Sequence, residues 1–118
     1  MKNRGVLVIA AVVVLFFAIG GYFIFSRVVA GGQARTFDVT VAGDKMSPPT
    51  ISVNQGDKVT LNVTGDKKEE IHLHGYDIHF EIEKAGGNVT RTFTADKTGE
   101  FGIEIEASGT RLGSLKVS

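Results

Sequence analysis

Apolar residues follow two different patterns in this chain, a continuous run near the amino terminus and a strict alternation with polar residues after it. Residues Val6 to Phe25 carry no charged side chain, and about 20 such residues are enough for a helix to span a bilayer. We therefore predict a transmembrane anchor over residues 6–26, preceded by a short cytoplasmic segment (1–5) and followed by a linker (27–36). A cleaved signal peptide is the alternative, but its apolar stretch is usually only about 7–15 residues long.

Beyond the linker, apolar and polar residues alternate with the period of two that is typical of strands with one buried face. The alternating apolar positions are Phe37, Val39 and Val41; Ile51 and Val53; Val59, Leu61 and Val63; Ile71 and Leu73; Ile78, Phe80 and Ile82; Val89 and Phe93; Phe101, Ile103 and Ile105; and Leu115 and Val117. Turn-forming pairs such as Gly43-Asp44 and Gly86-Gly87 separate these runs. Short strands at this spacing predict one all-β domain, a sandwich or a barrel, over residues 37–118.

The alternation changes phase within the part of the chain that contains the histidines. Apolar residues occupy odd positions up to Leu73 and even positions from Ile78 to Ile82. A strand changes the face that it buries only through an inserted residue or a bend, and Gly75 is the residue best suited to supply one. We therefore expect a bend at Gly75, of the kind that often lies beside functional sites.

The distribution of charge limits the location and the partners of the domain. Lys2 and Arg4 precede the apolar run, which favours a cytoplasmic amino terminus and a C-terminal domain outside the cytoplasm, periplasmic or extracellular. From Thr36 onward there are nine Lys or Arg and thirteen Asp or Glu, a net charge of −4, which argues against nucleic acid and anionic lipid as partners. The chain has no cysteine, so this small domain depends on β packing, a metal or a partner for its stability.

The histidines of the chain lie within eight residues of one another: His72, His74 and His79. His72 and His74 alternate with Ile71 and Leu73, so both project from the outward face of one strand and can share a metal ion. His79 also points away from the core, next to Glu81. Imidazole is a ligand for copper, zinc and nickel. The alternative is that these are solvated strand residues with no ligand.

From Met46 onward, the order of segments resembles the cupredoxin family. The stretch Ile51 to Val63 is similar to the early strands of that family, and His74-Gly75-Tyr76-Asp77 is similar to the segment that carries its first histidine ligand. Thr94 to Phe101 is similar to the approach to the last ligand loop, and Gly113 to Val117 is similar to the final strand. The resemblance implies a Greek-key β-sandwich and a role connected with copper.

The closing loop departs from the family pattern. Blue-copper cupredoxins use a thiolate, a second histidine and usually a methionine from this loop. Here Ile105, Ser108 and Arg111 fall near those positions, and the segment Ile103 to Gly113 contains no Cys, His or Met. Neither a blue-copper centre nor a dinuclear thiolate centre can be built, so the electron-transfer site that the resemblance implies is missing.

The resemblance also implies a different metal site. In the cupredoxin fold, the strand that bears His74 lies beside the strand before the closing loop, where Glu104 and Glu106 alternate with apolar residues and point outward. The candidate metal ligands are His72, His74, His79 and Glu106, a set that suits Cu(II) or Zn(II) better than Cu(I). The alternative is that the glutamates only solvate an exposed strand. Met46 is expected to pack in the core.

Two functions follow from these observations. The first is a membrane-tethered cupredoxin-like domain that binds or hands over copper, mononuclear and non-blue, near a membrane oxidase or a copper transporter. The second retains the fold without a metal and makes the domain a structural or accessory subunit of a membrane complex. No catalytic triad order, nucleotide-binding glycine loop or zinc-protease motif is present, so catalysis is not expected.

Overall fold

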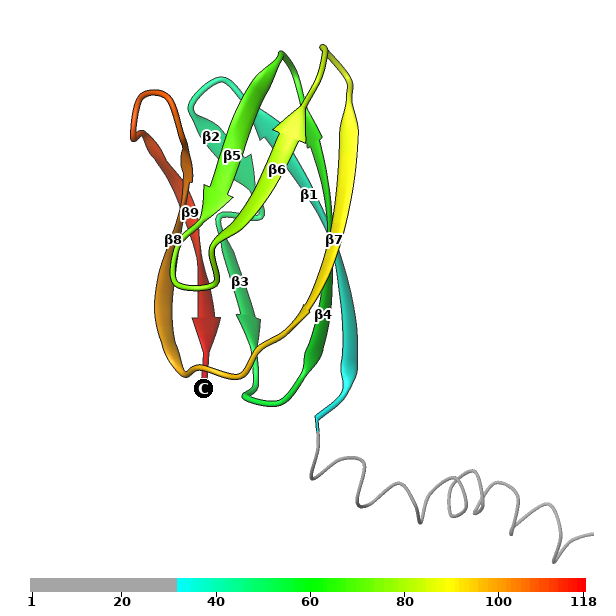
Figure 1. Ribbon diagram of the computed structural model, residues 1–118, viewed down its shortest axis with the longest axis vertical. Coiled ribbons are helices and arrows are strands. Elements are labelled where there is room, and N and C mark those ends of the chain that lie inside the picture. Colours follow the sequence, from blue (N-terminus) through cyan, green and yellow to red (C-terminus); the bar gives the residue numbers. More distant parts are fainter. Residues whose placement is uncertain (1–31) are drawn as a thin grey trace, which may run out of the picture. The chain divides into compact units, whose positions relative to one another are not determined.

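The computed structural model describes residues 32–118 (Figure 1). The anchor predicted over residues 6–26, the segment before it and most of the predicted linker lie outside the described residues. Within residues 32–118 there is no helix long and apolar enough to cross a membrane.

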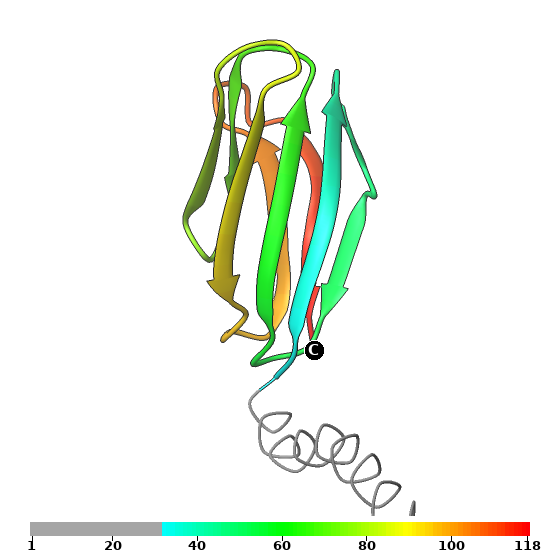
Figure 2. The ribbon, with the colours of Figure 1, turned by 90° about the vertical axis from the view of Figure 1, so that its right-hand side faces the viewer.

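Nine strands make up the described domain, in the order β1 Ala34–Ala42, β2 Lys45–Ser47, β3 Thr50–Val53, β4 Lys58–Gly65, β5 Glu69–Leu73, β6 Ile78–Ile82, β7 Asn88–Thr94, β8 Gly99–Ile105 and β9 Arg111–Val117. They form a four-stranded sheet in the order β2-β1-β4-β7 and a five-stranded sheet in the order β3-β9-β8-β5-β6. Figure 2 shows the first sheet in front of the second. Both sheets contain parallel and antiparallel pairs. The prediction of an all-β domain is therefore confirmed.

The core lies between the two sheets and is built from the alternating apolar positions. On β4, Val59, Leu61 and Val63 are all buried, and so are Ile71 and Leu73 on β5. Burying one such side chain contributes about 1.5–3 kcal/mol. Because neighbouring side chains on a strand point to opposite faces, burial of Ile71 and Leu73 directs the residues between and beside them outward.

The first strand begins at Ala34, inside the stretch that hydropathy assigned to the linker. Ala34 and the residues after it pair in parallel with β4, starting at Lys58. Arg35 adds an ion pair, with its Nε 3.4 Å from Oδ2 of the buried Asp57. The backbone pairing and the ion pair join residues far apart in the sequence and do not depend on alternating apolar side chains, so the apolar pattern does not reveal them.

The phase change in the sequence predicted a bend at Gly75. In the structure the chain reverses there, between two antiparallel strands. The turn between β5 and β6 contains two residues with positive φ, Gly75 at 86° and Asp77 at 52°. Asp is one of the few non-glycine side chains that adopt this conformation readily. A Cβ atom at position 75 would collide with the ring of Phe101. Glycine is thus required both for the backbone conformation and for the close approach of the turn to β8.

Two alanine substitutions separate the energetic cost of the positive φ at Gly75 from the cost of its close approach to Phe101. Gly86 has a similar φ of 81°, but no atom lies within 4 Å of the position of its missing Cβ. We expect Gly86→Ala to lower the free energy of unfolding by about 1 kcal/mol and Gly75→Ala by about 3 kcal/mol, because the latter also displaces Phe101. Urea denaturation of the two variants measures the difference, and equal losses would contradict this packing of the turn.

Candidate metal centre

The strand order of the five-stranded sheet brings the predicted site residues together. β5 lies between β6 and β8. In the register of these pairs, His72 is opposite His79 on β6 and opposite Glu104 on β8. Since directly paired residues point to the same face of a sheet, these three side chains form one row on the outer face.

The imidazole ring of His72 contacts the rings of both His74 and His79. The ring of His72 stacks on that of His79, with centroids 4.3 Å apart and an interplanar angle of 20°. His74, the first residue after β5, meets His72 edge to face at a centroid distance of 4.4 Å. His72 is the central ring, and only 13% of its side chain is exposed, against 50% for His74 and 39% for His79.

Carboxylates surround the three rings. Asp77 Oδ1 lies 3.1 Å from His72 Nε2 and 3.3 Å from His79 Nε2, and hydrogen-bonds to both. His74 Nε2 contacts Glu104 Oε2. On the other side of the rings, Glu106 Oε1 is 3.4 Å from His72 Nδ1 and Glu70 Oε2 is 2.6 Å from His79 Nδ1.

The pKa values in the cluster show how charge is balanced without a metal. Hydrogen bonds from His72 and then from His79 hold the pKa of Asp77 below its ordinary value. Desolvation by itself lowers the pKa of His79, but the neighbouring carboxylates of Glu70 and Asp77 outweigh it, so the net pKa of His79 is raised. A proton on His79 is thus stabilised where the carboxylates converge, which is where another cation would be stabilised as well.

Two nitrogens of the cluster are buried and each faces a carboxylate oxygen, namely Nδ1 of His72 opposite Glu106 at 3.4 Å and Nδ1 of His79 opposite Glu70 at 2.6 Å. An ionised carboxylate only accepts hydrogen bonds, so Asp77 takes one from the Nε2–H of each ring. In the neutral ring, Nδ1 then carries a lone pair that faces a carboxylate oxygen of Glu106 or Glu70. A proton on Nδ1 removes this conflict by donating to the carboxylate, in line with the raised pKa of His79. The imidazole nitrogens and carboxylate oxygens of the cluster are also a donor set that fits Cu(II) or Zn(II).

Two sets of three side chains have ligand atoms close enough to share one ion. The first set is His72, His74 and Glu104, and the second is His72, Asp77 and His79. In each set the ligand atoms lie within 4.8 Å of one another. Each set would hold a metal through two imidazoles and one carboxylate, and His72 is common to both.

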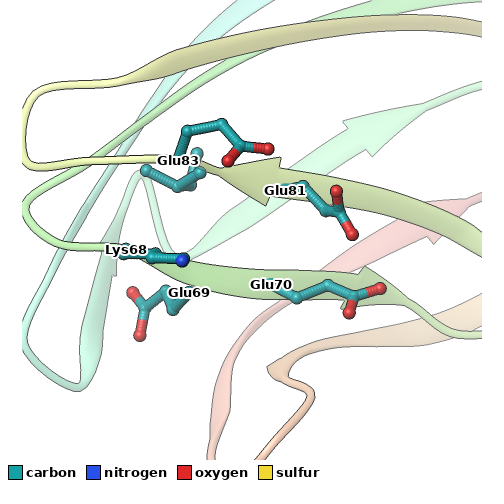
Figure 3. Close-up of a pocket in the computed structure, with 6 residues that line it drawn as sticks. Lys68, Glu69, Glu70, Glu81 and Glu83 are labelled. Atoms are coloured by element: carbon teal, nitrogen blue, oxygen red, sulfur yellow. The ribbon is translucent and has the colours of Figure 1, made fainter.

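An acidic groove adjoins the cluster along β5 and β6 (Figure 3). Its volume is about 500 Å³, and it is lined by Lys68, Glu69, Glu70, Glu81, Ile82 and Glu83. Glu70 and Glu81 are directly opposite each other on the two strands, an arrangement of like charges that is unfavourable by itself. Burial raises the pKa of Glu69, although Lys67 opposes the shift. Glu70 also contacts His79, so the groove reaches the imidazole cluster.

Two contacts from outside the cluster hold the β5–β6 hairpin in place. The hydroxyl of Tyr76 donates to the carbonyl of Lys97 (2.7 Å) and accepts from the amide of the same residue (2.9 Å). Its ring packs on Phe93 and Phe101. From the opposite sheet, Nε of Arg91 donates to the carbonyl of His79 at 3.0 Å. The turn that carries Asp77 and the strand that carries His79 are therefore fixed by groups that are not candidate ligands.

All four predicted ligands, His72, His74, His79 and Glu106, lie in this one cluster. Sequence reasoning also placed Glu104 beside them, but it missed Glu70 and Asp77. Glu70 follows the strand period, since it lies two residues before His72 on β5, whereas Asp77 lies in the turn between β5 and β6. Met46 is buried in the core, as expected, and takes no part in the cluster.

The positions at which blue-copper cupredoxins carry their other ligands are occupied by ordinary structural contacts. Ile105 is buried in the core. Ser108 hydrogen-bonds to Thr110 within the loop, and Arg111 forms an ion pair with Glu100 at 3.6 Å. These residues do not fit a blue-copper ion.

In sequence, the chain matches no protein-family model and no curated protein. Among solved structures it is similar to a copper-binding protein in its apo form (17% identity, TM-score 0.58), with 74% of this chain covering 97% of that one. It is also similar to the metal-binding domain of a Cu(I)-exporting P-type ATPase from Streptococcus pneumoniae D39 (14% identity, TM-score 0.60, 75% of this chain and 97% of that one). A third similar structure is a purple cupredoxin from Nitrosopumilus maritimus (14% identity, TM-score 0.50, 69% and 98%). The described domain therefore has a cupredoxin-like fold.

The contact between Glu70 and His79 can be tested without a metal. We expect the His79 imidazole to titrate above its ordinary pKa of about 6.5, and Glu70→Gln to lower that pKa because one of the two neighbouring negative charges is lost. Glu100→Gln, which removes a carboxylate paired with Arg111, is the control and leaves His79 unchanged. The imidazole NMR shifts, followed against pH, give the three values. A His79 pKa that is insensitive to Glu70→Gln would contradict the geometry.

Proposed function

We propose that this domain binds a copper ion on the outer face of its five-stranded sheet and hands it on, without forming a blue-copper centre. The observation that carries the proposal is the pair of ligand sets around His72, whose ring contacts both His74 and His79 and in which the three ligand atoms of each set lie within 4.8 Å of one another. Two imidazoles and a carboxylate at this spacing are a donor set that suits Cu(II).

The residues of the cluster have separable tasks in this proposal. His72 supplies a nearly buried nitrogen donor, and His74 and His79 supply further imidazole donors on either side of it. Asp77 orients two of the rings through its hydrogen bonds to both Nε2 atoms. Imidazole with carboxylate favours Cu(II) over Cu(I), so the domain is suited to holding and delivering the ion, and the chain has no cysteine to supply a blue-copper thiolate.

The surrounding charge favours capture of a cation. The acidic groove contains Glu69, Glu70, Glu81 and Glu83, of which Glu70 contacts His79, and the chain from Thr36 onward has a net charge of −4. A surface lined by one sign of charge raises the local concentration of counter-ions and their rate of association.

The proposal includes location and partner. The apolar run over residues 6–26 would tether the domain to a membrane, with the sandwich outside the cytoplasm. A copper transporter or a membrane oxidase is the kind of partner that such a tethered copper carrier would serve. The likeness of this domain to the metal-binding domain of a copper-exporting ATPase is compatible with the first of these.

A metal-free accessory subunit is the second candidate function, and one observation favours it. The closing loop has lost every blue-copper ligand, while Asp77 and Glu104 give each histidine a carboxylate contact even without a metal. This function predicts that a variant without the histidines still assembles with its membrane complex, and that the wild-type chain shows no specific copper affinity.

Copper titration of the full chain separates the two functions. We expect wild type to bind one Cu(II) without an intense blue absorption band, and His72→Ala/His74→Ala to bind at least about 100-fold more weakly, because fewer than two imidazoles of either ligand set remain. Thr90→Ala/Thr92→Ala is the matched control, since it truncates two polar side chains two residues apart on β7 of the other sheet.

Isothermal titration and visible absorption provide the measurements, and circular dichroism checks that each variant is folded. If wild type and the histidine double variant bind Cu(II) equally weakly, copper binding by this cluster is ruled out and the accessory function is favoured.

A further inference from the structure

The geometry points to more than one way of holding the ion, an inference that rests on the proposed function. His72, His74 and Glu104 form one set of potential ligands, and His72, Asp77 and His79 form the other. In the first set, His72 comes from β5, His74 directly follows β5 and Glu104 comes from β8. The members of the second set come from β5, the turn and β6. The two sets therefore lie on opposite sides of the strand that carries His72.

We propose that one copper ion occupies two alternative positions on this sheet face, with His72 as a ligand in both, and that it passes between them by exchanging the other two ligands. His72 is the most buried of the three histidines, with 13% of its side chain exposed. Its ring touches both His74 and His79. An ion held by His72 is thus within reach of donors on either side and need not return to solvent between them.

Simultaneous occupation of both positions is disfavoured by the shared ligand. Two cations would have to use the two nitrogens of one imidazole as a bridge, which requires loss of its last ring proton. They would also repel each other at short range. The structure therefore favours one ion with two arrangements over a dinuclear centre.

The two arrangements face different surroundings, and this difference allows the exchange to serve transfer of the ion to a partner. His74, in the first set, is half exposed. Asp77 and His79, in the second set, line a pocket of about 350 Å³ together with Ile78, Arg91 and Thr92. An incoming ligand from a partner protein can replace the donors on one side while His72 and the other side retain the ion. Transfer by stepwise ligand exchange follows from this arrangement.

The pattern of affinities among histidine variants distinguishes this inference from a single three-histidine site. When two arrangements are equally populated, removing one lowers the overall association constant only about twofold. We therefore expect His74→Ala and His79→Ala to weaken Cu(II) binding only a few-fold each. His72→Ala and the His74→Ala/His79→Ala double variant are expected to weaken it about 100-fold or more, because each leaves at most one imidazole in either set.

Electron paramagnetic resonance of the full chain at less than one equivalent of Cu(II) provides an independent readout. Wild type should give two superimposed Cu(II) signals, of which His74→Ala retains one and His79→Ala the other. Glu100→Gln is the control and retains both signals. Melting curves of the copper-free variants show whether a loss of binding reflects unfolding.

Each outcome decides between defined possibilities. One equivalent of copper, two signals and small single-variant effects support the inference. Large losses from His74→Ala and His79→Ala alike, with one signal throughout, would overturn it while leaving copper binding intact. Two equivalents with a spin-coupled signal would also overturn it in favour of a dinuclear centre. Absence of specific binding by wild type would remove the proposed function itself.

Discussion

The backbone pairing of β5 with its two neighbours decides which side chains meet on the outer face of the five-stranded sheet. In the observed register, His72 is flanked by His79 on β6 and by Glu104 on β8. A shift of one residue in either pair would turn the alternating side chains to the opposite face. Burial of Ile71 and Leu73 at less than 1% exposure opposes such a shift, because it would bring histidines into an apolar core.

The turn at Gly75 fixes the same register from one end. Its close approach to Phe101 and the two hydrogen bonds of Tyr76 to Lys97 dock the hairpin against the end of the sandwich. The positive φ of Asp77 then directs one carboxylate to the Nε2 atoms of two histidines. The packing that stabilises the fold and the geometry of the cluster therefore depend on the same few residues.

The periodicity of the sequence was sufficient to predict most strands and the outward direction of the histidines, because both follow from local alternation. The prediction that Glu104 and Glu106 lie beside the histidines came from the cupredoxin resemblance, because the order of strands in a sheet does not follow from local alternation. Glu70 has no apolar alternation to mark it, because charged residues dominate the segment Asp66 to Glu70, although β5 already begins at Glu69. Asp77 was missed for a different reason: its contacts depend on the reversal of the chain at Gly75, which the phase change alone did not distinguish from a bend.

The central claim is that imidazole and carboxylate groups of this cluster take the place of the thiolate centre that the fold otherwise supports. X-ray absorption of the copper-loaded chain tests it most directly. The account predicts a first shell of nitrogen and oxygen only, with the outer-shell scattering of two imidazoles, which falls to that of at most one in His72→Ala. A sulfur ligand from methionine, or a copper environment without imidazole scattering, would contradict it.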